Sequence, residues 1–75
     1  MIDTPTLSAF MAVAETGSFS AAAERLYITQ PAISKRIALL EQQLGARLFD
    51  RVGRQIQLTE AGRSLLPRAR QVLMD

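Results

Sequence analysis

Neither a disulfide nor a common metal centre can hold this chain together, because its 75 residues include no cysteine and no histidine. A domain of this size buries only about 60–65% of the surface that its unfolded chain exposes. Its stability must therefore come from one apolar core, for which a hydrophobic share of 48% is sufficient. We expect one small domain that folds without a cofactor or a metal.

The same absence limits the possible functions. A chain without histidine and cysteine lacks the usual zinc ligands, the usual general base and the Ser-His triad. Its seven carboxylates are spread along the sequence rather than grouped. We predict no catalytic, cofactor or metal site, and a protein that is not an enzyme.

No membrane or export signal is evident. The longest uncharged run, residues 4–14, is far too short to span a bilayer. Met1 is followed by Ile2 and Asp3 instead of the basic region of a signal peptide. The expected location is the cytoplasm.

Charge is distributed unevenly along the chain. Residues 1–24 carry only acidic charges, whereas all nine Lys and Arg residues lie from Arg25 onward. A basic half on a small domain favours a polyanionic partner such as nucleic acid. Arginine is also common on ordinary solvated helices, so the charge by itself is a weak signal.

Two helices are predicted near the start of the chain. Thr4 can cap the first, with Pro5 at the first helical position and Gly17 as the stop. The second is expected over residues 21–26, with Ser20 as its cap. Three consecutive alanines begin it, and such small side chains allow another helix to approach closely.

The third predicted helix covers residues 30–44, with Thr29 as its cap and Gly45 as its stop. At about 100° per residue, its side chains separate onto two sides. The apolar side comprises Ile33, Ile37, Leu40 and Leu44. The opposite side comprises Pro31, Ser34, Lys35, Ala38 and Gln42.

A small hairpin is predicted next. Residues 55–58 alternate polar and apolar, as a half-buried strand does, and residues 48–50 can pair with them. Residues 51–54 would form the tip, where a glycine can adopt a positive φ. Arg51 and Arg54 would then lie at the end of the hairpin.

A last helix is predicted from Glu60 onward, capped by Thr59. Its apolar stripe comprises Leu65, Leu66, Ala69, Val72 and Leu73. The later members lie beyond the reach of so small a core, so we interpret the stripe as a dimer seam. The alternative is that these residues pack on the first helix. The pattern is still running at Asp75, so we expect the helix to continue in a longer protein.

The order of these elements is typical of one fold. Two helices joined by a tight turn form a helix-turn-helix unit, whose second helix enters the DNA major groove. We predict a mainly α, winged helix-turn-helix fold with a three-helix core, a two-stranded β-wing and a long C-terminal helix. The N-terminal end of the third helix would face base edges and phosphates.

The sequence also resembles a known family. The segments "SFSAAAERLYITQPAISKRIALLEQQLGARLFDR" and "LTEAG" are similar to the N-terminal DNA-binding domain of LysR-type transcriptional regulators. Many short motifs agree at fixed spacing, and together they cover nearly the whole chain. The agreement is therefore more specific than any single motif.

The resemblance implies a division of the chain. Residues 1–58 would form the DNA-binding domain, with the helix-turn-helix at about 19–38 and the wing at about 47–58. Residues 59–75 would begin a linker and dimerisation helix. An effector-binding domain would follow outside these residues, so a small-molecule effector would act only through that domain. The implied partners are double-stranded promoter DNA and further copies of the protein, as a dimer or a tetramer.

The resemblance also assigns residues to the DNA. Base contacts map onto Gln30, Pro31 and Ser34, with Lys35 beside them, and the minor-groove arginine maps onto Arg54. The full set of predicted DNA contacts is Gln30, Pro31, Ser34, Lys35, Arg54, Arg51, Thr29, Ser18 and Arg36. Arg36 lies on the flank, where it would contact a phosphate or an internal carboxylate rather than a base. Ser18 and Thr29 act first as helix caps and would contact phosphates as well. Each residue also has a plainer interpretation, as a solvated helix turn or a hairpin-tip charge.

One other function class is compatible with this fold. Winged-helix domains are also used for protein–protein association without nucleic acid. The basic front of the third helix argues against that alternative, because a protein-docking surface would carry more apolar bulk.

Overall fold

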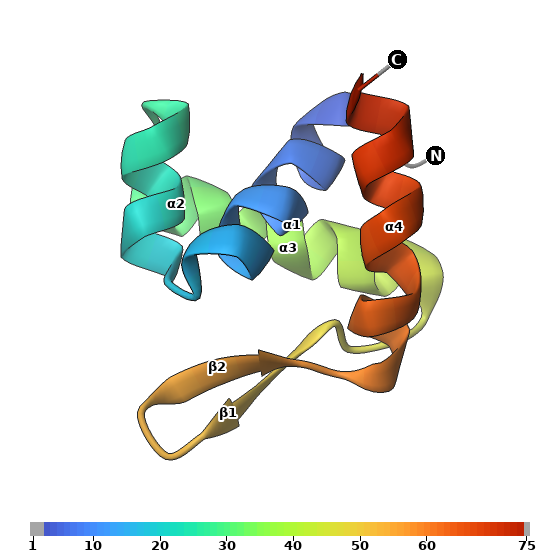
Figure 1. Cartoon of the computed structure of the whole chain (residues 1–75). Helices are drawn as coiled ribbons and strands as arrows, with labels where there is room; N and C mark the ends of the chain where they lie inside the picture. Colours follow the sequence, from blue (N-terminus) through green and yellow to red (C-terminus); the bar gives the residue numbers. More distant parts are fainter. Residues whose placement is uncertain (1–2, 75) are drawn as a thin grey trace.

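The computed structural model describes residues 3–74, which form four helices and one two-stranded antiparallel sheet. The elements are α1 (Thr4–Thr16), α2 (Phe19–Leu26), α3 (Gln30–Leu44), β1 (Phe49–Val52), β2 (Gln55–Leu58) and α4 (Glu60–Met74). Helices α1, α2 and α3 pack together, α4 lies against α1, and the hairpin projects from the body (Figure 1). The predicted winged helix-turn-helix fold is confirmed. Within residues 3–74, no helix is both long and apolar enough to cross a membrane.

The core is formed where α1, α3 and the segment before β1 meet. Its largest fully buried side chains are Phe10, Ile33, Leu40, Leu48 and Val13. Ala22 and Ala23 of α2 are also buried, which confirms that small residues bring this helix close to its neighbours. The body is therefore stabilised mainly by apolar burial, at about 25 cal/mol per Å² of apolar surface.

The cap of α1 is Asp3, and the prediction of Thr4 was wrong. Asp3 has an extended backbone, and its carboxylate accepts a hydrogen bond of 3.1 Å from the backbone N–H of Thr6. Thr4 is already helical. A carboxylate at this end is also favoured by the helix dipole, which a hydroxyl cannot exploit. Gly17 ends the helix with a φ of 71°, as predicted.

The cap of α2 is Ser18, two residues earlier than the predicted Ser20. The Ser18 hydroxyl oxygen accepts a hydrogen bond of 3.1 Å from the N–H of Ala21. Phe19 thereby becomes the first helical residue, and its ring packs edge-on against Phe49 with 6.2 Å between centroids. A contact with the distant hairpin thus accompanies the earlier start of the helix.

Helix α3 has the predicted ends, with Thr29 as cap and Gly45 at a φ of 69°. Ile33, Ile37 and Leu40 are buried as predicted. Leu44 is 38% exposed, so its assignment to the buried side was wrong. It lies in the last turn, at the edge of an open hollow that Leu48 and Leu65 also line.

The hairpin has a shorter tip than predicted. Strand β1 continues to Val52, which pairs with Gln55, so only Gly53 and Arg54 form the turn. Gly53 has the predicted positive φ, at 64°. Phe49 at the base of the hairpin is buried against Phe10, with 5.5 Å between ring centroids.

Helix α4 contributes to the core of its own chain. Thr59 caps it as predicted, accepting a hydrogen bond of 3.1 Å from the N–H of Gly62. Ala69 is fully buried, so its side chain is not available to a second molecule and its place in the predicted dimer seam was wrong. The remaining members differ in exposure: Leu65, Leu66 and Leu73 are half-buried against the core, and Val72 is 55% exposed.

Candidate nucleic-acid interface

The turn between α2 and α3 is tight and well defined. Tyr27 ends α2 in the left-handed conformation, with a φ of 57°. Two residues later the Thr29 hydroxyl oxygen accepts a hydrogen bond of 3.2 Å from the N–H of Ala32. This cap leaves Gln30 and Pro31 in the first turn of α3, and both are exposed. The start of α3 is therefore fixed in position while its first side chains remain accessible.

Helix α3 has one buried and one open side. The side chains that face away from the core are all exposed, and we call them the outer face: Pro31, Ser34, Lys35, Ala38 and Gln42. The outer face carries no side chain longer than glutamine apart from Lys35. A helix with such a slim exposed side can enter a groove about 12 Å wide.

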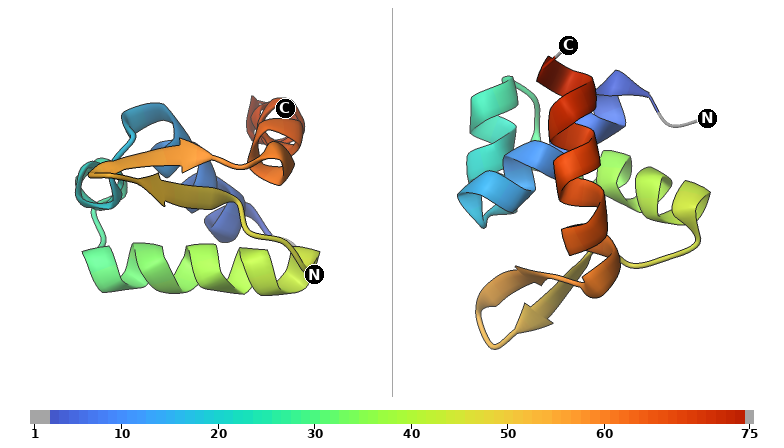
Figure 2. Two further views of the ribbon diagram at one scale, coloured as in Figure 1. Left: turned by 90° about the horizontal axis from the view of Figure 1, so that it is seen from below. Right: turned by 45° about the vertical axis from the view of Figure 1, so that its right-hand side comes forward.

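The hairpin brings arginines to the same side of the molecule. The start of α2, the start of α3 and the hairpin together line one polar hollow, to which Ser18, Ser20, Gln30, Arg51 and Arg54 contribute. Two views of the ribbon place the hairpin tip on the side where α3 begins (Figures 1 and 2). Residues from three separate segments thus form one continuous polar surface.

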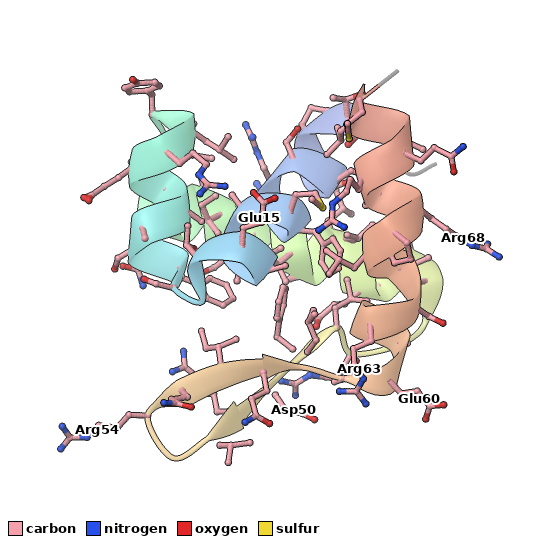
Figure 3. All side chains as sticks on the ribbon, viewed as in Figure 1. Glu15, Asp50, Arg54, Glu60, Arg63 and Arg68 are labelled. Carbon is pink, nitrogen blue, oxygen red and sulfur yellow. The ribbon has the colours of Figure 1, made fainter. Side chains whose placement is uncertain are left out.

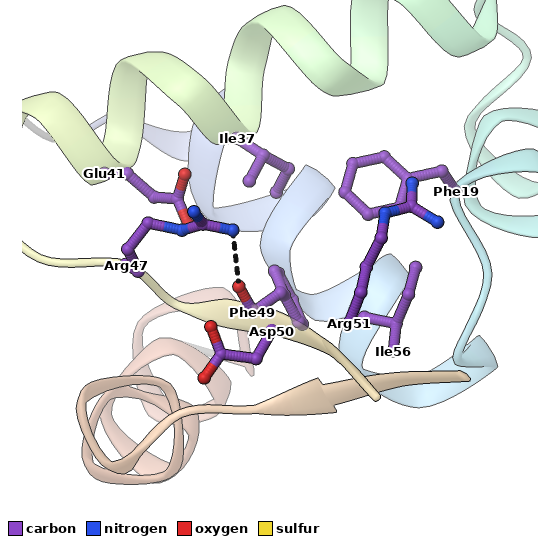
Figure 4. Close-up of a pocket in the computed structure, with 8 residues that line it drawn as sticks. All are labelled: Phe19, Ile37, Glu41, Arg47, Phe49, Asp50, Arg51 and Ile56. Carbon is purple, nitrogen blue, oxygen red and sulfur yellow. Dashed lines mark hydrogen bonds between the residues drawn. The ribbon is translucent and has the colours of Figure 1, made fainter. Parts of the chain in front are cut away.

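The two wing arginines point in different directions. Arg54 extends outward from the hairpin turn (Figure 3). Arg51 lies on the side of the hairpin that faces Phe19, whereas Asp50 points to the other side (Figure 4). Neighbouring residues of a strand face opposite sides, and within residues 3–74 no ion pair joins Asp50 to Arg51. The charge of Arg51 is therefore not neutralised by its neighbour.

The other predicted contacts are also at the surface. Lys35 is exposed and Arg36 is half-buried on the flank of α3. In the described part of the chain, the one ion pair joins Arg25 to Glu15 on the other side of the body. Ser18 is half-buried, with its oxygen engaged as the α2 cap. Thr29 is exposed, but its hydroxyl oxygen is engaged as a helix cap in the same way. The other predicted contacts are exposed, apart from the half-buried Arg36.

One residue of this surface was missed by the sequence interpretation. The Ser20 hydroxyl donates a hydrogen bond of 2.9 Å to the side-chain oxygen of Gln30. The sequence pattern assigns Ser20 to a helix cap, and no sequence spacing marks its contact with a residue ten positions away. The bond leaves the amide N–H groups of Gln30 free to donate to an acceptor in front of the helix.

Comparison with known proteins identifies close relatives. The chain is 69% identical over 72 residues to an HTH-type transcriptional regulator in the ibpB-leuC intergenic region of Azotobacter vinelandii. It is 55% identical over 73 residues to the HTH-type transcriptional activator AllS of Klebsiella pneumoniae. These alignments cover 96% and 97% of the chain but only 50% and 27% of the relatives.

Solved structures with the same fold include two protein–DNA complexes. The chain matches the DNA-binding domain of CbnR in its DNA complex with a TM-score of 0.91 and 42% identity, over 97% of this chain and 84% of that one. It matches the DNA-binding domain of BenM, in complex with catB site 1 DNA, with a TM-score of 0.92 and 36% identity. That match covers 97% of this chain and 82% of that one.

The family follows from a direct match to a family description. Residues 5–63, which include every element from α1 to the first turn of α4, match the bacterial regulatory helix-turn-helix protein, lysR family. Helices α2 and α3 with the turn between them form the helix-turn-helix that this description names. The chain belongs to the lysR family of bacterial regulatory helix-turn-helix proteins.

Proposed function

We propose that this chain binds double-stranded DNA sequence-specifically, as the promoter-binding domain of a bacterial transcriptional regulator. The observation that carries the proposal is the exposed front of α3, which lies beside the arginines of the hairpin on one polar surface. The likeness to CbnR and BenM domains crystallised with DNA supports it. Promoter DNA would also place the protein in the cytoplasm, and its role would be regulatory rather than enzymatic.

The front of α3 would read bases in the major groove. Gln30 would donate its amide hydrogens to a base acceptor, since its oxygen is already bonded to Ser20. Pro31 can contact a thymine methyl group, and Ser34 and Lys35 extend the same polar face. Each good base contact is worth about 1–3 kcal/mol of discrimination.

Phosphate and minor-groove contacts would orient the helix. Thr29 and Arg36 flank the start of α3 and would contact phosphates, with Ser18 behind them. Arg54 extends from the wing and would enter the minor groove, where a narrow width concentrates negative potential. Arg51 would contact the backbone beside it.

Assembly would use the C-terminal helix. We propose a dimer in which α4 of two copies meet through exposed apolar residues such as Val72 and Met74. In this arrangement residues 1–58 read the DNA and residues 59–75 join the copies, although α4 also helps to form the core. An effector, or a tetramer, would require parts of a longer protein.

Selection of bound sequences from a random DNA pool tests the proposed base contacts. The wild-type chain should yield one preferred site, and Gln30→Ala should lose the preference at one base position, at a cost of about 1–3 kcal/mol. Gln71→Ala is the matched control, because Gln71 is an exposed glutamine on α4 and lies outside the outer face. Unchanged preference in the Gln30→Ala protein would contradict the assignment of that residue.

Salt dependence tests whether the two wing arginines neutralise DNA charge, Arg51 at the backbone and Arg54 in the minor groove. The logarithm of the binding constant should fall linearly with the logarithm of salt concentration, by about 0.9 for each phosphate neutralised. Arg51→Ala and Arg54→Ala should each make the slope shallower by about that amount. An absence of binding to any duplex at low salt would favour the protein–protein alternative.

A further inference from the structure

The angle of the wing relative to α3 is determined at the base of the hairpin. Residues 52–55 at its outer end are exposed, whereas Phe49 is buried and Ile56 is half-buried against the core. A two-stranded hairpin is only marginally stable without such support. Contacts at the base must therefore decide where the tip lies.

Leu48, immediately before β1, is held through both of its backbone groups. Its N–H donates a hydrogen bond of 2.7 Å to a carboxylate oxygen of Glu41. Its carbonyl accepts a hydrogen bond of 3.0 Å from the N–H of Thr59. Its side chain is fully buried. This residue is thus fixed from two sides, by α3 and by the segment that begins α4.

The attachment to α4 is close. The Thr59 hydroxyl donates to the carbonyl of Arg47, beside Leu48. A Cβ atom added to Gly62 would lie 2.4 Å from the Leu48 carbonyl oxygen, so α4 approaches as near as a glycine permits. These contacts attach Leu48 to the start of α4. They do not link Leu48 to α3.

The attachment to α3 is made by Glu41. Glu41 lies on the same rigid helix as Gln30, about three turns further along. Figure 4 shows its side chain reaching from α3 toward the base of β1, where Arg47 donates a hydrogen bond of 3.1 Å to the Phe49 carbonyl.

We propose that Glu41 is a positioning residue, which sets the angle of the wing against the recognition helix α3. The effect of Glu41 on DNA binding rests on the proposed function. In that function, the wing angle fixes the spacing between the major-groove and minor-groove contacts. Glu41 itself lies behind the outer face and does not contact the DNA. It acts through Leu48 and β1 on Arg54.

Two conservative variants distinguish the length of the Glu41 side chain from its negative charge. Glu41→Asp keeps the charge but is shorter by one methylene, so its carboxylate no longer reaches the Leu48 N–H. Glu41→Gln keeps the length and an acceptor oxygen but loses the charge. If reach to Leu48 is what matters, the first variant should release the wing and the second should retain it.

The wing angle can be measured in the free protein. Since the chain has no cysteine, Val52→Cys on the wing and Gln42→Cys on α3 would accept two spin labels at exposed positions. The distance distribution between the labels should be narrow in the parent and in Glu41→Gln, and broader or shifted in Glu41→Asp. Identical distributions in all three proteins would overturn the proposal.

A double-mutant cycle tests the effect on DNA. Arg54→Ala should lower affinity for the selected site about tenfold in the parent and in Glu41→Gln, but by no more than about twofold in Glu41→Asp. Glu24→Gln, on the exposed surface of α2, controls for the loss of one negative charge. An equal loss in every background would contradict a role for Glu41 through the wing.

The two proposals can fail separately. If the wild-type chain binds no DNA sequence preferentially, the proposed function fails, and the label distances still decide the role of Glu41. If the wild-type chain binds its site but the distances and the cycle show no dependence on Glu41, the positioning role fails and the proposed function stands.

Discussion

At Gly62 the first turn of α4 packs closely against Leu48, which precedes β1. In most exposed helix positions, replacing glycine by alanine stabilises the helix by about 1 kcal/mol. Here the added methyl would lie 2.4 Å from the Leu48 carbonyl oxygen and 2.8 Å from a Leu58 methyl carbon. Backbone on one side and a packed side chain on the other leave little room for the methyl.

We therefore expect Gly62→Ala to lower the free energy of unfolding by about 1–2 kcal/mol, since overpacking costs about 1–3 kcal/mol. For a domain of this size, the melting temperature should fall by about 4–8 °C per kcal/mol. Thermal unfolding followed by circular dichroism measures it. Ser64→Ala, exposed on the same helix, is the matched control and should not destabilise the protein.

Asp3 makes stability depend on pH. Its pKa lies below the ordinary value of 3.8, chiefly because the backbone N–H of Thr6 donates to the carboxylate and secondly because of the Thr6 side chain. The folded state therefore binds this proton less readily than the unfolded state. The stabilisation is complete above the unfolded pKa and is lost as the pH falls through the folded pKa.

We expect wild type to be more stable than Asp3→Ala at about pH 7, with the difference shrinking as the pH falls below the ordinary carboxyl pKa of 3.8 and through the lower pKa of the folded state. Asp3→Asn keeps an acceptor that does not titrate, so its advantage over Asp3→Ala should persist in acid. Thermal melts of the three proteins at about pH 7 and in acid measure these differences in stability. A wild-type advantage that is independent of pH would contradict this role for the carboxylate.

At the scale of elements, α2 contributes a buried alanine to the core, whereas α3 carries the outer face that we propose for recognition. Ala22 of α2 is fully buried, whereas Ala38 of α3 is exposed on the outer face. The same substitution at these two alanines should therefore have opposite consequences. The Ala22 site has no space for a larger side chain inside the protein, whereas the proposed function predicts that the Ala38 site lacks space only when the outer face lies in DNA.

Ala22→Leu should destabilise the fold by about 1–3 kcal/mol through overpacking. Ala38→Leu should change stability by no more than about 0.5 kcal/mol but weaken specific DNA binding by about 1–3 kcal/mol, as for a lost base contact. Denaturant unfolding and DNA titration, applied to both proteins, separate the effects. Undiminished DNA binding by Ala38→Leu would indicate that the outer face does not enter the groove.

At the scale of the whole molecule, α4 has a buried side and an exposed side. Ala69 is fully buried and closes the core, whereas Val72 is 55% exposed. We expect Val72→Asp to leave the unfolding free energy within about 0.5 kcal/mol of wild type and to reduce self-association. Sedimentation velocity over a range of concentrations measures self-association, with Gln71→Asp as the neighbouring control. Equal self-association of all three proteins would contradict a seam at Val72.

Features that depend on nearby residues could be predicted from the sequence. Thr29 and Gly45 limit α3, and Gly53 turns the hairpin, because caps and left-handed glycines satisfy backbone groups within a few residues. The spacing of apolar residues at the helical period predicted the buried side of α3, at Ile33 and Ile37. The exposed side followed as well, and with it most of the candidate DNA-binding residues.

Features that depend on where distant segments meet required the tertiary structure. Leu44 fits the apolar period yet lies open, and Ala69 fits a dimer stripe yet is buried against its own chain. The bonds from Ser20 to Gln30 and from Glu41 to Leu48 also join separate elements. The sequence by itself determined the order of the helices, both ends of α3 and most of its two sides, because periodicity and capping are local. Only the tertiary structure decided what covers each face, because that depends on the packing of residues far apart in the chain.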